Sequence, residues 1–389
     1  MKSKRIAIIN QRYGEEVNGG SEYYTKKLAE HLAPFYDVEV LTTTAKDYDT
    51  WKPYYEKGAC KIDGVHVLRF PVEKQRGKWK FRIIKLLMLI LPKFLTTKLE
   101  YCWLVEQGPF CPELIEYIQK ERLQYDVFIF VTYLYYTTVM GIKEVLEKAI
   151  LVPTAHNEYC IHFDIYKEMF TNVKGIAYLT AEEEAFVEGL FNNSNIPHVI
   201  AGVGIDSVKG ILNKIGEPQT DFPYLIYVGR VDRGKGCHVL FRYFEKYKKR
   251  HQGNLKLIVL GKMMLPPPNT EDIICLGFVS EEEKLKWMSK ARALILPSRY
   301  ESLSLSVLEA LEMGVPVLVN GRSSVLKGHC IRSGAGYIYE NYLEFEKGIL
   351  DFLNSEEDYQ KMKRFGIEYV RKYYDWMRTI KKYEELIEE

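Results

Sequence analysis

Short apolar runs alternate with longer amphipathic segments along the first half of the chain. The runs that predict buried strands are Arg5–Ile9, Val38–Thr42, Val65–Phe70, Asp126–Val131, Ile150–Pro153 and Gly175–Leu179. Helical periodicity is clearest between them, at Ser21–Leu32 and Ala181–Phe191. Because strands separated by helices usually pair in parallel, this alternation predicts a doubly wound α/β sheet.

The same alternation restarts at Tyr224, after a polar, glycine-bearing stretch from Ala201 to about Pro223 that we interpret as a linker. Further strands are predicted at Leu255–Leu260, Ile273–Leu276, Ala293–Leu296 and Pro316–Val319, and helices at about Lys235–Arg250, Glu281–Lys290 and Ser304–Met313. The charged segment Glu356–Glu389 is also predicted to be helical. The sequence therefore predicts an α/β protein with two successive Rossmann-like domains and a cleft between them.

Residues 74–98 break this alternation, because eight basic side chains surround the apolar run Ile83–Leu91. The run is much shorter than the roughly 20 residues that span a bilayer. A basic, apolar helix can lie on an anionic membrane surface, or it can pack on a core with solvated ends. No clean amphipathic period separates these two interpretations, so peripheral membrane contact through 74–98 stays open.

Composition excludes some classes of function. The chain has 389 residues, with 54 Lys and Arg against 52 Asp and Glu, so its net charge is only +2. This balance argues against a nucleic-acid partner held by bulk charge. The seven cysteines form no C-x-x-C pair, and their number is odd, which favours reduced thiols over a disulfide framework or a zinc site. With no apolar leader before the first strand, we expect a cytoplasmic protein.

Two glutamates eight positions apart, Glu301 and Glu309, are the most informative feature of the chain. Glu301 follows a predicted buried strand and precedes a helix, and Glu309 lies inside that helix. The carboxyl ends of parallel strands and the amino ends of helices form the crevice in which open α/β sheets bind ligands, phosphates among them. A carboxylate beside such a crevice can accept hydrogen bonds from sugar hydroxyls.

A second motif opens the second domain. Gly229 and Arg230 end the strand that starts at Tyr224, and Lys235 and Gly236 start the next helix. Glycine allows a ligand to approach the backbone, while arginine and lysine offer donors to phosphate oxygens. The order of a Walker A loop is absent, so this is a different diphosphate-binding arrangement.

Together, these motifs resemble the retaining GT-B-fold glycosyltransferases of family four, also called glycosyl transferases group 1. The Gly-Arg and Lys-Gly pairs are followed by E-x7-E about 65 residues later. Weaker matches extend the resemblance over nearly the whole chain, at Asn18–Glu22, Pro153–Asn157, Gly204–Asp206, Leu276–Ser280 and Tyr373–Trp376.

The resemblance implies a domain division and a set of site residues. Residues 1–205 would bind the acceptor, 206–371 the nucleotide-sugar donor, and 372–389 would form a helix that returns to the first domain. It implies catalytic roles for His156, Glu301, Arg230 and Lys235. It implies donor binding by Gly19, Gly20, Gly229, Arg230, Lys235, Phe278, Val279, Glu301, Ser302, Leu303, Ser304, Leu305 and Glu309.

The family description also implies roles for individual side chains. Arg230 and Lys235 would hold the donor diphosphate, Glu309 the ribose hydroxyls, and Glu301 and His156 the donor sugar. The reaction would be a front-face displacement that retains configuration, without an enzyme nucleophile. The chain departs from the family pattern at Ser302 and Ser304, where glycines are frequent, and at Asn157, where an aspartate is usual.

No cofactor and no metal ion are expected. Asp47 and Asp49 form a D-x-D motif, but one such motif without further oxygen ligands is insufficient for a metal site. The motifs do not distinguish UDP-, GDP-, ADP- and dTDP-sugars, and the acceptor could be a glycan or a lipid-linked sugar. We expect a role in surface polysaccharide or glycolipid assembly at the inner membrane face. A non-hydrolysing sugar-nucleotide epimerase and a non-catalytic sugar-nucleotide-binding subunit remain as alternatives.

Overall fold

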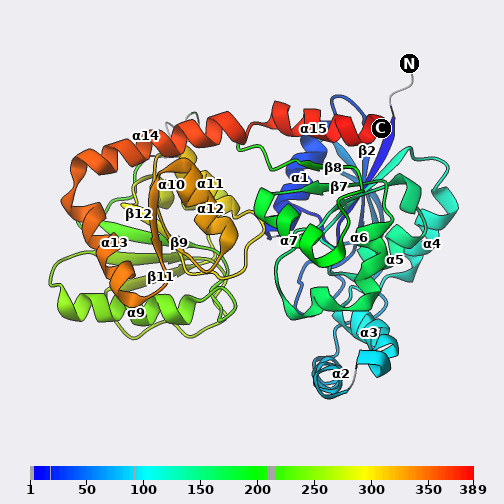
Figure 1. Cartoon of the computed structure of the whole chain (residues 1–389), viewed down its shortest axis with the longest axis horizontal. Coiled ribbons are helices and arrows are strands. Elements are labelled where there is room, and N and C mark those ends of the chain that lie inside the picture. The colour runs from blue at the N-terminus through cyan, green and yellow to red at the C-terminus, as the bar shows by residue number, and fades with distance from the viewer. Residues whose placement is uncertain (1–3, 18, 92, 209, 211–215) are drawn as a thin grey trace. The chain divides into compact units, whose positions relative to one another are not determined.

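The computed structural model of the chain describes residues 4–17, 19–91, 93–208, 210 and 216–389. The chain folds into two compact units: residues 1–202 with 379–389, and residues 203–378. Figure 1 shows that each unit contains one sheet accompanied by helices.

The first unit contains an eight-stranded sheet in the order β3-β4-β2-β1-β5-β6-β7-β8. The strands are β1 (Arg5–Ile9), β2 (Asp37–Thr43), β3 (Gly58–Ile62), β4 (Val65–Phe70), β5 (Val127–Val131), β6 (Ala149–Val152), β7 (Gly175–Tyr178) and β8 (His198–Ile200). β3 runs antiparallel to β4, and the other described neighbours pair in parallel. The chain leaves β1 toward β2 on one side and returns to β5 on the other, which places its crossovers on both faces.

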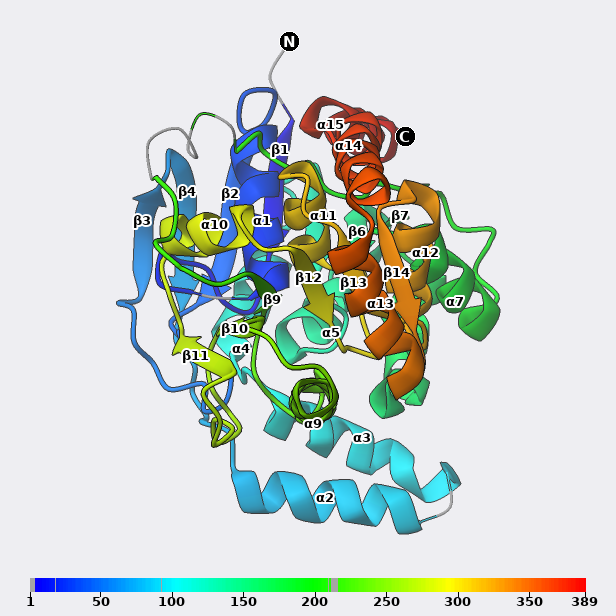
Figure 2. The ribbon, with the colours of Figure 1, turned by 90° about the vertical axis from the view of Figure 1, so that its left-hand side faces the viewer.

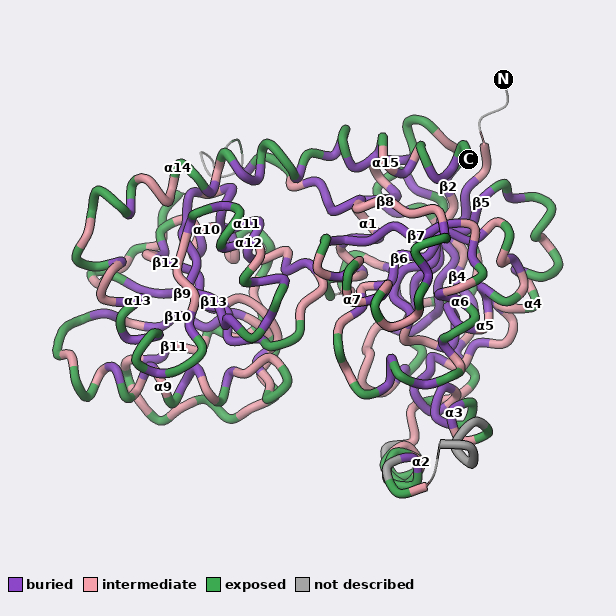
Figure 3. Tube along the Cα trace, viewed as in Figure 1, coloured by how far each residue is buried: buried purple, intermediate pink, exposed green. Residues whose placement is uncertain are grey.

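Helices connect these strands. They are α1 (Gly20–Leu32), α2 (Lys78–Ile90), α3 (Lys93–Gln107), α4 (Pro112–Glu121), α5 (Tyr136–Lys143), α6 (Lys167–Thr171) and α7 (Ala181–Phe191), with short 3₁₀ turns at Leu146–Lys148, Tyr159–His162 and Asp164–Tyr166. Every residue of the central strand β5 is buried, as expected for a parallel strand covered on both faces. Figure 3 shows the same burial along neighbouring strands.

The second unit contains a six-stranded parallel sheet in the order β11-β10-β9-β12-β13-β14. Its strands are β9 (Tyr224–Val228), β10 (Lys256–Leu260), β11 (Ile273–Gly277), β12 (Ala293–Leu296), β13 (Val317–Asn320) and β14 (Gly336–Tyr339). Its helices are α9 (Cys237–Arg250), α10 (Glu281–Ser289), α11 (Leu305–Glu312), α12 (Ser324–Ser333), α13 (Tyr342–Asn354) and α14 (Glu356–Tyr373).

The last helix, α15 (Trp376–Glu388), starts in the second unit, and its residues from Thr379 onward belong to the first. Within the first unit, the Tyr383 hydroxyl lies 2.6 Å from that of Tyr24 on α1, and both side chains are buried. The Lys382 ammonium donates to the carbonyl of Ile200 at the end of β8. The C-terminal residues are therefore an integral part of the first unit's core.

The structure confirms the strands and helices predicted from the sequence, with small shifts of their ends. The predicted helical segment Glu356–Glu389 is divided into α14 and α15. The elements that were not predicted are β3, β8 and β14, and α3, α4, α5, α6, α12 and α13. Residues 18, 209 and 211–215, which include part of the N-terminal glycine motif and of the predicted linker, lie outside the described residues.

Candidate functional site

The order of strands in the second unit locates a candidate site. β9 is flanked by β10 on one side and by β12 on the other, so the order of strands along the chain reverses between β9 and β12. The loops that follow β9 and β12 leave the same edge of the sheet side by side. In open α/β sheets this reversal point is where ligands bind, and both loops carry residues that the sequence analysis selected.

Asp232 orients the two basic residues of the β9 loop. Its carboxylate accepts a hydrogen bond from Arg230 Nε and another, 2.7 Å long, from the backbone N–H of Lys235. The first of these is a charge-assisted bond, the stronger class of hydrogen bond. Asp232 was not selected from the sequence, although its position between Arg230 and Lys235 placed it within reach of both.

Glycines bring the loops of this edge into backbone contact. A Cβ atom on Gly261, which follows β10, would lie 1.9 Å from the carbonyl oxygen of Gly229. One on Gly236 would lie 2.6 Å from the carbonyl oxygen of Pro297, in the loop after β12. All three glycines also have positive φ angles. A side chain at Gly236 or Gly261 would therefore separate the loops.

An ion pair joins the two loops across the reversal point. Lys235 Nζ lies 2.7 Å from Glu301 Oε1, and the Glu301 side chain is only 12% exposed. Because the pair is partly shielded from water, its attraction is stronger than that of an exposed pair. The structure thus brings together Arg230, Lys235 and Glu301, three of the four residues expected to be catalytic.

Two helices begin at this edge without a side-chain cap. The N-cap of α9 is Gly236, which has no side chain. The N-cap of α11 is Ser304, whose hydroxyl accepts no bond from the helix. By contrast, α10, α12 and α13 of the same unit are capped by Ser280, Ser323 and Asn341. The first amides of a helix need an acceptor, and an anion can serve as one.

Ser304 has an unusual backbone conformation for a serine, with φ of 71°. This is the left-handed region, which side chains other than glycine enter at a cost. Ser304 is one of the two serines that stand where the resembling family frequently has glycine. The loop thus keeps a glycine-like backbone in spite of the substitution.

Glu309 is buried on α11 and paired with a lysine from α10. Its Oε2 lies 2.9 Å from Lys284 Nζ, which also lies 2.6 Å from Glu281 Oε1. Burial raises the pKa of Glu309, and the Lys284 ammonium opposes that rise. Burial also acts to lower the pKa of Lys284, but the Glu309 and Glu281 carboxylates raise it overall. Lys284 therefore holds the second glutamate of E-x7-E, and no sequence motif had indicated it.

The loop after β11 carries Phe278 and Val279, which the sequence analysis placed near the nucleotide base. Gly277 has a positive φ, and its carbonyl accepts a 2.7 Å bond from the N–H of Gly261. This bond joins the loop to the edge already formed by β9 and β10. Phe278 is exposed, and Val279 is partly exposed.

A buried histidine fixes the middle of the β12–α11 loop. His329 Nε2 on α12 lies 2.7 Å from the carbonyl oxygen of Leu303, and its Nδ1 lies 3.0 Å from the Tyr369 hydroxyl. Tyr369 and Tyr374 also share a contact of 3.1 Å between their hydroxyls. This network ties the loop to α12 and to the end of α14. His329 is interior to a helix and gave no sequence signal.

The surroundings of the α9 N-terminus are electropositive. Burial lowers the pKa of His238, and the guanidinium groups of Arg233, Arg242 and Arg299 lower it further. The smaller part of this shift, which comes from the three guanidinium groups, indicates basic charge near the α9 N-terminus. Such a field favours an anionic ligand near the two uncapped helices.

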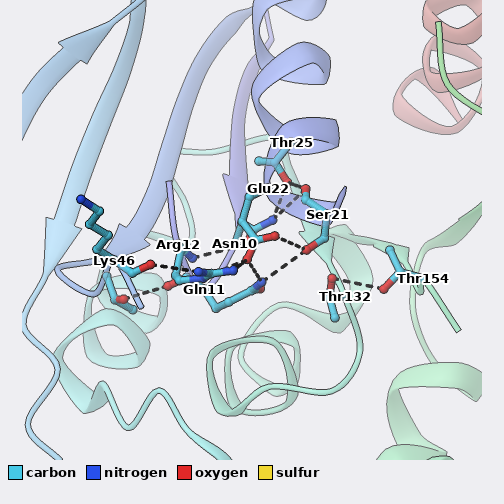
Figure 4. Close-up of polar contacts among 10 residues, drawn as sticks. Asn10, Gln11, Arg12, Ser21, Glu22, Thr25, Lys46, Thr132 and Thr154 are labelled. Atoms are coloured by element: carbon cyan, nitrogen blue, oxygen red, sulfur yellow. Dashed lines mark hydrogen bonds and ion pairs between the residues drawn. The ribbon is translucent and has the colours of Figure 1, made fainter. Parts of the chain in front are cut away.

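In the first unit, polar side chains gather where β1 ends and α1 begins (Figure 4). Arg12 and Gln11 both donate to Oε1 of the buried Glu22, and Ser21 donates to its Oε2. Asn10 donates to the Thr25 hydroxyl at 2.6 Å. A buried charge needs such partners, because an unpaired one would be strongly destabilising.

Gly19 and Gly20, predicted to contact the ligand, start α1 beside this cluster. A Cβ atom on Gly19 would lie 2.0 Å from Glu22 Oε2, whereas one on Gly20 would meet nothing within 4 Å. A side chain at Gly19 would therefore force the Glu22 carboxylate to move. Arg12 was not selected from the sequence, and Glu22 was quoted within a motif without a role.

Two threonines with positive φ angles end the adjacent strands β5 and β6. Thr132 has φ of 74° and Thr154 of 52°, and Thr154 Oγ1 lies 3.2 Å from Thr132 Oγ1. β1 and β5 are the pair at which this sheet reverses its order. Positive φ angles are uncommon in β-branched residues, and backbone strain of this kind concentrates at functional sites.

His156 follows Thr154 in the same loop. Its Nε2 lies 3.7 Å from Glu158 Oε1, and Glu158 also accepts a 2.7 Å bond from the Tyr133 hydroxyl. Asn157, which replaces the family's usual aspartate, instead lies 3.1 Å from His162 through its Oδ1. The carboxylate near His156 is thus Glu158, which the sequence analysis did not select.

The D-x-D motif has a local structural role at its first residue. Asp47 Oδ2 accepts a 2.9 Å bond from Thr50, and its backbone carbonyl accepts one from the N–H of Trp51. Within the described ranges, no cluster of three or more His, Cys, Asp or Glu side chains is arranged to hold a metal ion.

The geometry of the second unit agrees with a comparison of sequences. Residues 209–369 match the model of the family described as glycosyl transferases group 1. This region is similar in sequence to the group 1 glycosyltransferases, as its motifs suggested. It contains all the selected residues of the β9, β11 and β12 loops, and Glu309. Gly19, Gly20 and His156 lie outside it, in the first unit.

Sequence similarity to individual proteins is limited to part of the chain. An uncharacterized glycosyltransferase of Methanocaldococcus jannaschii is 28% identical over 118 residues, which are 28% of this chain and 30% of the relative. The alignment thus spans less than a third of that relative's length. It supports the family assignment of the region and leaves the activity of the whole protein to be proposed.

Solved structures match over the whole chain. Sucrose-phosphate synthase of Thermosynechococcus elongatus has a TM-score of 0.70 at 16% identity and covers 98% of both chains. An Anabaena protein in complex with UDP and glucose has a TM-score of 0.71 at 11% identity and covers 99% of both chains. At these identities the similarity concerns the fold, and it confirms the predicted GT-B class with two α/β domains.

Proposed function

We propose that this protein transfers a hexose from a nucleotide-sugar donor to an acceptor alcohol with retention of configuration. The observation that carries the proposal is the Lys235–Glu301 pair, which joins the loops after β9 and β12 at the reversal point of the second sheet. A cation for phosphate and a carboxylate for sugar hydroxyls then stand side by side, as a nucleotide sugar requires.

In this proposal residues 206–371 bind the donor. The diphosphate lies against Arg230, Lys235 and the first amides of α9 and α11, supported by the two uncapped helix starts and the electropositive surroundings. Glu309 accepts bonds from the ribose hydroxyls, and the backbone of Phe278 and Val279 meets the base. Glu301 and the loop Ser302–Leu305 face the sugar. UDP-sugars are the first donors to test, since the Anabaena structure holds UDP.

The proposed reaction exchanges one bond at the anomeric carbon. The bond from this carbon to the donor phosphate oxygen breaks, and a bond to the acceptor oxygen forms on the same face. The acceptor's proton passes to the departing phosphate oxygen. Arg230 and Lys235 stabilise the charge that develops on this diphosphate. Because these two side chains supply the compensating positive charge, turnover should be undiminished in EDTA.

Residues 1–205 are proposed to bind the acceptor. The support is the edge formed by the ends of β1, β5 and β6, where Gln11, Thr132 and Thr154 place polar groups at the reversal point of the first sheet. Gly19 and Gly20 would allow close approach of a ligand. His156, near the Glu158 carboxylate, would contact the transferred sugar.

The donor site can be tested by thermal shift and calorimetry with UDP-, GDP-, ADP- and dTDP-sugars. One of these should stabilise the protein by about 2.7 kcal/mol when its concentration is a hundred times its Kd. Arg230→Ala should abolish most of this shift and lower kcat/KM at least about a hundredfold. Arg364→Ala, which removes an exposed arginine from α14, is the matched control and should keep both.

Several outcomes would contradict the proposal. Stabilisation by no nucleotide sugar, or equal stabilisation of the Arg230→Ala variant, would remove the proposed donor site. Donor binding without transfer to any acceptor would favour the non-catalytic subunit, and conversion of the free nucleotide sugar to its epimer would favour the epimerase. A covalent hexosyl adduct on Glu301 would exclude front-face displacement, and an inverted product would exclude retention.

We further propose that the reaction serves surface polysaccharide or glycolipid assembly on the cytoplasmic side of a membrane. The structure's only bearing on this setting is the basic segment 74–98, part of which forms α2. Among the described residues, no helix combines the length and apolar character needed to cross a bilayer. The proposed contact is therefore peripheral.

A further inference from the structure

Helix α2 is the outermost element at one end of the first unit (Figure 2). One side of the helix packs on the unit's core. Met88 is buried, Phe81 and Ile84 are partly buried against the same cluster, and the Phe81 ring lies 5.9 Å from that of Trp103 on α3. The spacing of these three residues, three and then four positions, places them on one face of the helix.

A second apolar stripe runs along the opposite face. Trp79, Ile83, Leu86 and Ile90 are spaced four, three and four positions apart, and Leu87 adjoins them. Trp79 is 77% exposed, Ile90 69%, and Ile83 and Leu86 more than half. At 100° per residue, the centre of this exposed stripe lies nearly opposite the packed one. Two opposed apolar stripes explain why the sequence showed no single amphipathic period.

Basic residues flank the exposed stripe. Lys80 and Arg82 lie on its two sides, with Lys85 farther around the helix, and all three are exposed. No aspartate or glutamate occurs between residues 74 and 99. Two other basic residues of the segment have structural partners: Lys74 pairs with Glu106, and Arg76 donates to the carbonyl of Gln107 at 2.7 Å. Among the residues of this segment whose side chains the structure describes, the charged neighbours of the exposed apolar face are thus all basic.

We infer that the exposed face of α2 (Trp79, Ile83, Leu86, Leu87 and Ile90, bordered by Lys80 and Arg82) docks on an anionic lipid surface. A 13-residue helix is about 20 Å long, which suits a helix lying in the plane of the interface. The apolar stripe enters the headgroup boundary, the tryptophan occupies the interface, and the bordering cations attract anionic headgroups. This inference deepens the proposed function, on which it rests for the identity of a lipid-linked acceptor.

Binding can be measured by sedimentation with phosphatidylglycerol–phosphatidylcholine vesicles, without donor or turnover. We expect binding that weakens with salt and is much weaker with phosphatidylcholine alone. Replacing Trp79, Ile83 and Ile90 by serine should weaken binding at least about tenfold, because most of the inserted apolar area is lost. Lys80→Glu with Arg82→Glu should weaken it at least about fivefold per position.

The chain supplies its own controls. Leu123 is 82% exposed in the same unit but outside the stripe, so Leu123→Ser should leave vesicle binding unchanged. Trp79 is the most exposed tryptophan described, whereas Trp51, Trp103 and Trp376 are buried. Its fluorescence should shift to shorter wavelength on binding, and Trp79→Phe should remove most of the shift while keeping binding. All these variants should melt like the wild type, because they alter exposed side chains.

Three results would overturn the inference. The first is equal binding to neutral and anionic vesicles. The second is unchanged vesicle binding by the triple serine variant. The third is a wild-type chain that self-associates and does not bind vesicles, with a triple serine variant that is monomeric. The last result would assign the stripe to contacts between copies. Because the assay needs no turnover, a chain that binds vesicles but transfers no sugar would refute only the proposed function.

Discussion

At the scale of single residues, the candidate site contains positions where the size of the side chain determines whether the backbone can adopt its observed conformation and contacts. Gly236 and Gly261 allow contacts that a Cβ atom would prevent. Ser304 adopts a glycine-like φ while carrying a side chain. The sequence had marked Ser304 as a departure from the family pattern, and the structure shows this serine in a backbone conformation that favours glycine.

Ser304→Gly should therefore stabilise the protein. Glycine removes the steric cost of the positive φ, although it adds some freedom to the unfolded chain, so we expect a net gain of up to about 1 kcal/mol in the free energy of unfolding. Thermal and urea unfolding would measure the gain. Ser302→Gly is the matched control, since Ser302 is not among the described residues with positive φ, and it should give no gain. Equal effects at both positions would mean that strain at Ser304 is negligible.

At the scale of elements, loops at the sheet edges are held by buried side chains from neighbouring helices. His329 on α12 holds the carbonyl of Leu303, and Glu183 on α7 accepts bonds from the N–H groups of Ala155 and Leu179. Glu183 thereby fixes the residue that precedes His156. His329 lies inside α12 and Glu183 lies in the first turn of α7, and neither position indicates from the sequence which distant backbone group it holds.

Glu183 should also make stability depend on pH. Burial raises its pKa from 4.5 to about 8, while the bonds from Leu179 and Ala155 oppose the rise. The folded state therefore binds a proton that the unfolded state releases. Its contribution is fully present below about pH 4.5 and is lost as the pH rises toward 8, with a limiting slope of about 1.4 kcal/mol per pH unit.

Urea unfolding of wild type and Glu183→Gln at several pH values between 4.5 and 8 would test this dependence. The unfolding free energy of the wild type minus that of Glu183→Gln should fall as the pH rises through this range, because only the wild type loses the contribution of the bound proton. Glu182→Gln, on the same turn but partly exposed, should follow the wild-type profile. A constant difference between wild type and Glu183→Gln would show that Glu183 is ionised throughout this range.

At the scale of the whole molecule, two units follow one construction rule. In each, a parallel sheet reverses its strand order, and the polar, glycine-containing loops lie at that reversal. The group 1 glycosyltransferase match falls in the second unit, so we expect a nucleotide to bind to that unit.

Hydrogen exchange on the full chain would locate the nucleotide. UDP, or whichever nucleoside diphosphate the screen selects, should slow exchange of the amides at 229–237 and 297–309. The amides of α1 and of 154–158 in the first unit should change little until an acceptor is added. Arg230→Ala should remove the protection at the same nucleotide concentration. Protection confined to the first unit would reverse the proposed division of labour.

The sequence by itself determined the class of fold and the positions of most central elements. Buried parallel strands such as β5 and β12 are continuous apolar runs, and their ends could be predicted within a residue or two. It also located Arg230, Lys235, Glu301 and Glu309, because glycines and charges at strand ends form local patterns. Peripheral elements such as β3 and β14 were missed, since their burial is mixed and their pattern is weaker.

Only the tertiary structure decided which side chains meet. The pairs Lys235–Glu301, Lys284–Glu309 and Arg12–Glu22 join residues from different elements, and no local spacing encodes such contacts. The same holds for α2, where one apolar stripe is covered by the core and the other is not. Hydrophobic pattern records that a residue tends to be buried, whereas packing determines what, if anything, buries it.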